Sequence, residues 1–436
     1  MKSASAKEYI IAGVIGFIIG LRLFGPALGL FYVAGGGACI YFAFKNNAFR
    51  VLTILPYLVN TEIFIRRGAG VTYVPYLFMQ YILIAVFLIM VLQKKGAVKM
   101  HSKALLPIFL YMVIETLDMM RADDITYARS MLTNTVVLFA VTLWATTNTI
   151  TPKLSEAIIK NIKIATIYLC GNILVAHFTH EITYMATSSS EASNYMSAVQ
   201  LSGYLGVGSS LFFLAVMDEK LKHQLFLNVF MFTLVVTLMV LTFSRGGLYF
   251  LSAVIILYML FNRQYIGKFV ILFLLIPIGY LIYYYVTETT NGLIEARYSE
   301  EGASGREDLV KAGFTIFFED PLVGVGTGNY GKQIKDRDLF PEESGAHNEF
   351  VRAAAEHGFL GILFYWGYYI IIVIEILGRK KAERELGTYF LVLFCLIIVH
   401  NGLKISMQPY ILAIAIATPT LIFVRKKKHA SLPYIT

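Results

Sequence analysis

The chain has 436 residues, of which 57% are hydrophobic and 15% are charged, and its mean hydropathy is +0.66. Soluble domains contain roughly 45–50% apolar and about 25% charged residues, so this composition excludes a single water-soluble domain. The net charge of +9 does not indicate a nucleic-acid partner, because most basic residues flank apolar runs. The three cysteines, Cys39, Cys170 and Cys395, lie inside apolar runs, where we expect them to pack as small hydrophobic residues.

Apolar windows of about twenty residues predict an all-α, polytopic membrane protein with about fourteen transmembrane helices. The predicted spans cover residues 8–24, 26–44, 49–65, 71–93, 104–120, 129–148, 160–178, 199–217, 224–243, 247–262, 269–286, 358–378, 387–401 and 407–424. We expect residues 1–436 to form one membrane domain whose first helix is not cleaved. The segment from Gly20 to Gly25 fits either a turn between two spans or a kink in one long hairpin.

The distribution of Lys and Arg predicts that both termini are cytoplasmic. In this topology the inner side has 23 of the 37 basic residues, with 18 Lys and 5 Arg, whereas the outer side has 4 Lys and 10 Arg. Arg binds phosphate and carboxylate through two parallel hydrogen bonds, so the outer bias predicts an external anion site. The simpler interpretation is that Arg snorkels well at helix ends. The basic run at residues 425–428 is expected to anchor the chain to anionic lipid.

Residues 287–357 form the one long connection, and we expect them to be an external catalytic loop, since long loops usually carry function. Within them, Ser304 and Glu307 have the spacing of a capping box, and apolar residues at helical spacing follow up to residue 317. This pattern predicts an amphipathic helix that lies on the membrane surface and ends at Asp320.

A glycine-rich segment, residues 323–331, follows this helix. It lacks the preceding strand and the terminal Gly-Lys-Ser/Thr of nucleotide loops, so we expect close backbone packing instead. Residues 346–358 then predict a short helix that runs into the next span, with His347 in its first turn. A helix N-terminus attracts anions, and histidine exchanges protons near neutral pH, so His347 is either a functional group or an ordinary surface histidine.

Three segments carry motifs in a characteristic order. They are Ser244-Arg245-Gly246-Gly247, residues 305–331 with Gly-Arg and Pro-Leu-x-Gly-x-Gly, and residues 346–361 with Ala-His-Asn and Glu-x-Gly-x-x-Gly. This order resembles the conserved core of the O-antigen ligase and Wzy-type polysaccharide polymerase superfamily. The N-terminal half is similar to that family only in having many apolar helices.

The resemblance implies a GT-C-like membrane glycosyltransferase that takes glycan from an undecaprenyl-pyrophosphate donor. The transfer would occur at the outer face of the bacterial inner membrane, with inversion and without a metal or other cofactor. The implied residues are Arg245 and Arg306, which stabilise the leaving pyrophosphate, and His347, which is the general base. We expect further substrate contacts from four polar residues: Asn348, Glu349, Arg352 and Arg121.

The acceptor separates two members of this superfamily. A polymerase extends another lipid-linked repeat unit into O-antigen or capsule, and a ligase uses lipid A-core. We favour the polymerase because the sequence has no dedicated lipid A-binding feature. The expected partners are the lipid-linked oligosaccharide, membrane lipids and a chain-length regulator protein.

Two other classes of protein are alternatives to the glycosyltransferase. A lipid-linked oligosaccharide flippase would suit the many helices, but the two halves show no internal repeat and the external Arg and His motifs would have no role. A peptidoglycan polymerase of the shape-and-division type would need an external catalytic acid that the sequence does not identify.

The remaining polar residues of the apolar segments have a structural and a functional interpretation. Glu62 and Arg66, like Glu115, Asp118 and Arg121, have helical spacing that predicts internal ion pairs, with a transporter's proton relay as the alternative. The pair His177 and His180, with Glu181, has a spacing that a metal would accept, although no third ligand is evident. The serine-rich residues 187–197 predict a flexible external loop.

Overall fold

The computed structural model describes residues 4–21, 25–66, 73–94, 102–179, 182–184, 188, 190–218, 223–262, 266–299, 305–379, 381–403 and 405–418. The regular structure of these residues is entirely helical, which confirms the all-α prediction. They form two compact units, one from residues 1–39, 49–76 and 152–301, the other from residues 40–48, 77–151 and 302–436.

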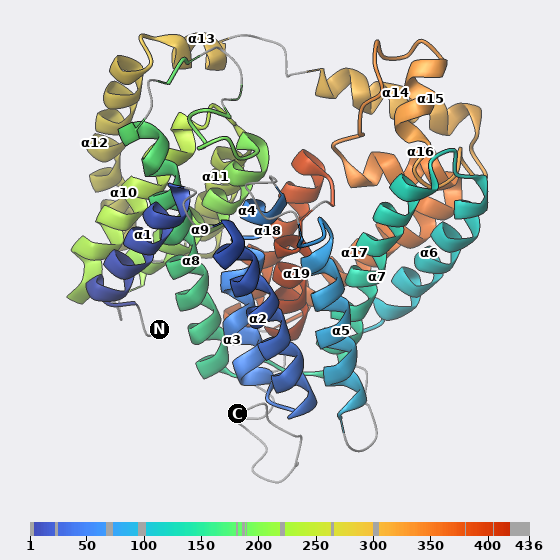
Figure 1. The fold of residues 1–436 in the computed structure, drawn as a ribbon, viewed down its shortest axis with the longest axis horizontal. Coiled ribbons are helices and arrows are strands. Elements are labelled where there is room, and N and C mark those ends of the chain that lie inside the picture. Colours follow the sequence, from blue (N-terminus) through green and yellow to red (C-terminus); the bar gives the residue numbers. More distant parts are fainter. Residues whose placement is uncertain are drawn as a thin grey trace. The chain divides into compact units, whose positions relative to one another are not determined.

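The first unit contains α1 (Ala6–Gly20), most of α2 (Gly25–Phe44), α3 (Ala48–Val59), α4 (Ile63–Arg66), α8 (Pro152–Thr179), α9 (Ala198–Met217), α10 (Leu225–Leu241), α11 (Gly246–Asn262), α12 (Ile266–Thr289) and α13 (Leu293–Ser299). Helix α1 packs along α8, and α9 packs against both α10 and α11 (Figure 1). A Cβ atom at Gly16 would lie 1.9 Å from the carbonyl oxygen of Tyr168, so only glycine permits this approach of α1 to α8.

The second unit contains α5 (Phe78–Leu92), α6 (Leu105–Asp118), η1 (Met119–Arg121), α7 (Ile125–Thr147), α14 (Arg306–Glu319), α15 (Tyr330–Asp336), α16 (Glu349–Gly361), η3 (Ile362–Trp366), α17 (Gly367–Leu377), α18 (Lys381–Asn401) and α19 (Met407–Ala417). Helix α7 packs against α5, α6 and α19, and α14 packs against α16. All the candidate site residues described below except Arg245 lie in this unit.

The helices agree with the apolar runs of the sequence. Each predicted span contains a helix, and the structure describes seven segments that are long and apolar enough to cross a membrane. These are Pro26–Phe44, Ala48–Arg66, Ile125–Thr147, Pro152–Thr179, Ala198–Met217, Glu349–Leu377 and Arg384–Asn401. Four shorter apolar helices, α5, α10, α11 and α19, lie at further predicted spans. The chain is a multi-pass membrane protein.

The predicted span over residues 49–65 is confirmed, but it consists of two helices rather than one. Helix α3 ends at Val59 and α4 begins at Ile63, and the intervening turn buries Glu62. Its carboxylate accepts a hydrogen bond of 3.0 Å from the hydroxyl of Tyr204 and lies 3.8 Å from the guanidinium of Arg66. The predicted Glu62–Arg66 ion pair is therefore confirmed.

The predicted amphipathic helix exists, but its apolar face packs against other helices of the protein. Helix α14 covers Arg306–Glu319 and buries Leu309, Ala312 and Ile316 in a protein core with residues of α15 and α16. The predicted capping box is also wrong, because the cap residue is Gly305, which has a φ of 66° and no side chain. Ser304 lies outside the described residues.

The other polar predictions have mixed outcomes. All three cysteines are free thiols, as expected. The flexibility of residues 187–197 stays a prediction; within them, the amide of Asn194 is buried and donates to the backbone oxygens of Gly20 and Asn172. His177 lies 3.4 Å from the hydroxyl of Tyr184, whereas its expected metal-binding neighbours at 180 and 181, and the basic run at 425–428, lie outside the described residues.

Candidate functional site

Helix α16 is interrupted at Gly358. This residue has φ 59° and ψ −142°, which is not helical, although the chain continues into η3 and α17. Glycine adopts this positive-φ conformation more readily than other residues. A Cβ atom here would also lie 2.6 Å from the carbonyl oxygen of Pro321. The break frees backbone groups that a continuous helix would pair internally, and these groups need other partners inside an apolar environment.

The glycine-rich segment supplies those partners. The amide of Phe359 donates to the carbonyl of Pro321 at 2.7 Å, while the amides of Val325 and Gly326 donate to the carbonyls of Ala355 and Glu356 at 3.1 and 2.8 Å. Gly324, with φ 62°, has no room for a Cβ, which would lie 2.4 Å from the carbonyl carbon of Glu356. The predicted close backbone packing of this segment is confirmed, and the Pro-Leu-x-Gly-x-Gly and Glu-x-Gly-x-x-Gly motifs are two halves of one contact.

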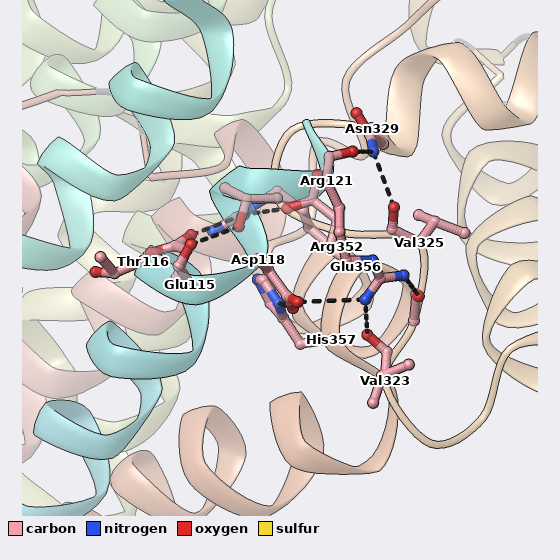
Figure 2. A network of polar contacts seen from close by, with 12 residues as sticks. Glu115, Thr116, Asp118, Arg121, Val323, Val325, Asn329, Arg352, Glu356 and His357 are labelled. Carbon is pink, nitrogen blue, oxygen red and sulfur yellow. Dashed lines mark hydrogen bonds and ion pairs between the residues drawn. The ribbon is translucent and has the colours of Figure 1, made fainter. Parts of the chain in front are cut away.

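A buried ion network lies beside this contact (Figure 2). Arg352 of α16, 4% exposed, binds Glu349 through Nε at 2.7 Å, and its Nη1 lies 2.5 Å from Glu356 and 3.2 Å from Glu115 of α6. Glu349 also accepts the backbone amide of Leu403 at 2.8 Å. One guanidinium thus joins three carboxylates from two helices. Removing one member of such a buried network strongly destabilises the fold, because each remaining charge stays buried without its partner and keeps its desolvation penalty.

A second set of ion pairs, in which only Arg121 is substantially exposed, continues the network towards the glycine-rich segment. The ring nitrogen Nδ1 of His357 lies 2.7 Å from Asp118, which also pairs with Arg121 at 3.2 Å. The guanidinium of Arg121 donates to the carbonyl oxygen of Val323 (Figure 2) and to that of Gly324. The predicted Asp118–Arg121 ion pair is confirmed, whereas Glu115 pairs with a residue 237 positions away that helical spacing could not identify.

The prediction that His347 lies in the first turn of a helix is wrong. Helix α16 begins at Glu349, and the side chain of Asn348 caps it by accepting the backbone amides of Phe350 and Val351 at 3.0 and 3.4 Å. His347 therefore precedes the cap, and its φ of 49° is left-handed. A side chain in this conformation carries strain that is concentrated at functional sites in proteins.

Arg306, at the start of α14, reaches His400, near the end of α18. Its Nη1 atom lies 2.9 Å from Nε2 of His400 and also contacts Nδ1. His347 is close enough for its charge to act on the same imidazole. Arg306 thus contacts a histidine that the sequence analysis missed, and His347 lies within electrostatic range of it.

Arg245 lies in the first unit, between α10 and α11. The hydroxyl of Ser202 donates to the carbonyl of Ser244 at 3.1 Å and accepts the amide of Gly247 at 2.9 Å, so α9 holds the Ser-Arg-Gly-Gly turn from both ends. Arg245 itself is half-buried. Its meeting with Arg306 and His347 stays a prediction.

The four expected substrate contacts have different surroundings. Arg121 is the most accessible, with a side chain 42% exposed. Asn348 is half-buried at its capping position, and Glu349 and Arg352 are buried in the ion network. Sequence reasoning also missed Glu356 and His357. The partner of Glu356, Arg352, lies at helical spacing four residues earlier, so a local signal existed, whereas the partner of His357, Asp118, lies 239 positions away.

One group in this unit has donor atoms of the kind that bind a metal. Single donor atoms of Glu115, Glu356 and His357 lie within 4.8 Å of one another. The guanidinium of Arg352 already bridges the two glutamates. A metal ion there would have to share the carboxylates with a fixed positive charge, so the residues fit a salt-bridge cluster better than a metal centre.

The fold and these contacts define a multi-pass membrane protein with a polar site built on an interrupted helix. Residues 229–366 match the family model described as O-antigen ligase. The match includes Arg245, Arg306 and His347 and confirms the resemblance to the O-antigen ligase and Wzy-type superfamily. Members of that family are enzymes that act on lipid-linked glycans. No curated protein matches the chain.

Proposed function

We propose that the protein is a glycosyltransferase that polymerises undecaprenyl-pyrophosphate-linked repeat units into a surface polysaccharide. The observation that carries this proposal is the contact of Arg306 with His400, together with the position of His347 within electrostatic range of the same imidazole. A guanidinium and a histidine at one place supply an anion-binding group and a proton acceptor. These are the two groups that transfer from a lipid pyrophosphate requires in the absence of a metal.

In the proposed reaction, an acceptor hydroxyl oxygen attacks the anomeric carbon of the donor glycan. The bond from that carbon to the pyrophosphate oxygen breaks, the electron pair leaves with the pyrophosphate, and His347 takes the hydroxyl proton. Arg306 and Arg245 stabilise the charge that develops on the leaving group. Attack opposite to the leaving group inverts the anomeric centre, and one preorganised donor of this kind contributes about 10²–10³-fold in rate.

The buried network has a supporting role in this proposal. Glu349 and Arg352 fix α16 directly after His347 and Asn348, and Arg121 holds the glycine-rich segment against the break in the helix. Because the side chain of Arg121 remains partly exposed, it is the member of this group that we assign to direct substrate contact. Asn348 positions His347 by capping the helix that follows it.

A ligase that transfers the same donor glycan to lipid A-core is the second candidate, and the description of the matching family favours it. We propose a bacterial inner-membrane location with the site on the outer face, where both acceptors are found. A chain-length regulator is a proposed partner of the polymerase. A flippase would move the intact lipid without breaking its glycosidic bond.

The test uses the purified protein in lipid nanodiscs with lipid-pyrophosphate-linked oligosaccharide and no ion gradient. A polymerase converts this single substrate into a ladder of longer glycans on a gel, and a ligase forms product only when lipid A-core is added. His347→Ala should abolish the product while donor binding persists. Complete recovery of intact donor under both conditions would refute the enzyme proposal and favour the flippase.

A further inference from the structure

A polar pocket lies in the second unit, next to the segment that carries His347. Its volume is about 450 Å³, within the range of roughly 300–1,000 Å³ typical of small-molecule sites. The pocket is lined by Asp123, Asp124, Tyr127, Gly328, Asn329, Gly331, Lys332, Glu343, Ser344 and Gly345. Gly345 precedes His347 by two residues, so their Cα atoms are at most about 7 Å apart.

The wall of this pocket is rigidly built. The side chain of Asn329 accepts the amide of Asp123 at 2.9 Å and donates to the carbonyls of Arg121 and Val325, both at 2.9 Å. Asp124 caps α7 by accepting the amides of Thr126 and Tyr127 with a single oxygen, Oδ1. These contacts join the loop before α7 to the glycine-rich segment, so the pocket is a consequence of the same packing that closes the break in α16.

The acidic side chains of the pocket retain oxygens that a ligand can use. Lys332 contacts Oδ2 of Asp123 at 3.1 Å, and Lys335 contacts Oε1 of Glu343 at 3.5 Å. Among the described residues, the second carboxylate oxygen makes no hydrogen bond or ion pair in either case, and the same is true of Oδ2 of Asp124. The ion pair with Asp123 raises the pKa of Lys332, which therefore stays charged and donates hydrogen bonds.

The charge of the pocket identifies the part of the substrate that it suits. The lining has three carboxylates and one lysine, and a second lysine, Lys335, pairs with Glu343 beside it, so the net charge is still negative. A pyrophosphate would meet net repulsion there, whereas sugar hydroxyl groups donate well to carboxylate oxygens. Tyr127 adds an aromatic ring with a polar end, which matches a sugar's apolar C–H face and its hydroxyl groups. Backbone at Gly328, Gly331 and Gly345 allows close approach to a ring.

We infer that this pocket is the subsite that binds a neutral sugar unit of the acceptor glycan, with Asp123, Asp124 and Glu343 accepting its hydroxyl groups. The inference rests on the proposed glycan transfer and adds to it the side from which the acceptor reaches His347. The lipid pyrophosphate of the donor then binds away from this pocket, at the arginines. Specificity for the acceptor sugar is set by the residues of this pocket.

The experiment measures binding of the lipid-free oligosaccharide released by mild acid from the host's own lipid-linked repeat unit. Saturation-transfer NMR on the full chain in nanodiscs should show binding, and Glu343→Gln should weaken it about tenfold by removing a charged acceptor. Two matched controls should bind like the wild type. Glu342→Gln changes an exposed neighbour outside the pocket, and Lys335→Met breaks the ion pair of Glu343 while keeping its carboxylate.

The outcomes separate this inference from the proposed function. No oligosaccharide binding by the wild type, or equal binding by Glu343→Gln, would overturn the subsite even if the protein still elongates glycan. Binding that Glu343→Gln weakens, in a protein that performs no transfer, would support the subsite and refute the enzyme. In the transfer assay, Glu343→Gln should raise the acceptor concentration for half-maximal rate about tenfold, and the two controls should not.

Discussion

The guanidinium of Arg306 donates to the imidazole of His400, a residue 94 positions further along the chain, with Nη1 at 2.9 Å from Nε2. A guanidinium has no acceptor, so the ring nitrogen that faces it must be unprotonated. His400 therefore acts as a neutral acceptor that fixes the direction of Arg306. We assign it as a positioning residue for the arginine, and its role is separable from that of His347.

His400→Phe should reduce glycan transfer by about 10²-fold, the effect expected when a catalytic group moves by about 1 Å. His400→Gln keeps a hydrogen-bond acceptor and should recover much of the loss, which a purely structural role would not explain. The exposed His223 provides a control, since His223→Phe should transfer normally. Equal activity of His400→Phe and the wild type would remove His400 from the site.

Arg306→Lys should keep the positive charge but lose about 10²–10³-fold in turnover, because lysine cannot make two parallel hydrogen bonds to phosphate oxygens. Arg245→Lys should have a similar effect if both side chains bind one leaving group. The double variant should then lose less than the product of the two single losses, since groups that act together are not additive. Strictly multiplicative losses would show that the two arginines act separately.

His347→Gly should separate catalysis from folding. The left-handed conformation costs most residues about 1–2 kcal/mol, and glycine adopts it freely, so the stability of this variant should match or exceed that of the wild type. Transfer should fall by about 10²–10⁴-fold with the loss of the base. Thermal unfolding and the ladder assay measure the two effects, and a variant that still elongates glycan excludes a histidine base.

Gly358→Ala should destabilise the protein by about 1–3 kcal/mol, because its conformation suits glycine and an added Cβ would meet the backbone of Pro321 and Leu322 at 2.6 Å. Gly367→Ala is the matched control in the same apolar segment. Gly367 is helical and has nothing within 4 Å of an added Cβ, so alanine there should be neutral or stabilising by about 0.5–1 kcal/mol. Equal stability of the two variants would contradict the interrupted helix.

Arg352→Met should cost about 3–5 kcal/mol, since it leaves Glu115, Glu349 and Glu356 buried without their common partner. Arg337→Met removes a guanidinium that also bridges two carboxylates, those of Glu319 and Asp320, but at the surface. There the loss should be at most about 1 kcal/mol, because water screens exposed pairs. Denaturant titration of both variants checks the difference, and equal losses would contradict the importance of burial.

Much of the secondary structure follows from composition and period. The apolar runs correctly predicted a helix in each span, and helical spacing identified the Glu62–Arg66 and Asp118–Arg121 pairs. The predictions that failed depend on contacts from distant segments. The apolar face of α14 was assigned to lipid because a pattern does not say what covers it, and α15 and α16 cover it in the structure.

The sequence alone determined that the chain lies in a membrane and which motifs carry its family resemblance, because hydrophobicity and local spacing are properties of neighbouring residues. Only the tertiary structure decided what the motifs do: the glycine-rich segment pairs with the backbone freed at Gly358, and Arg352 gathers carboxylates from two helices. It also brought His400 to Arg306. These contacts join segments up to 237 residues apart, and a buried polar group takes whichever partner the fold brings near it.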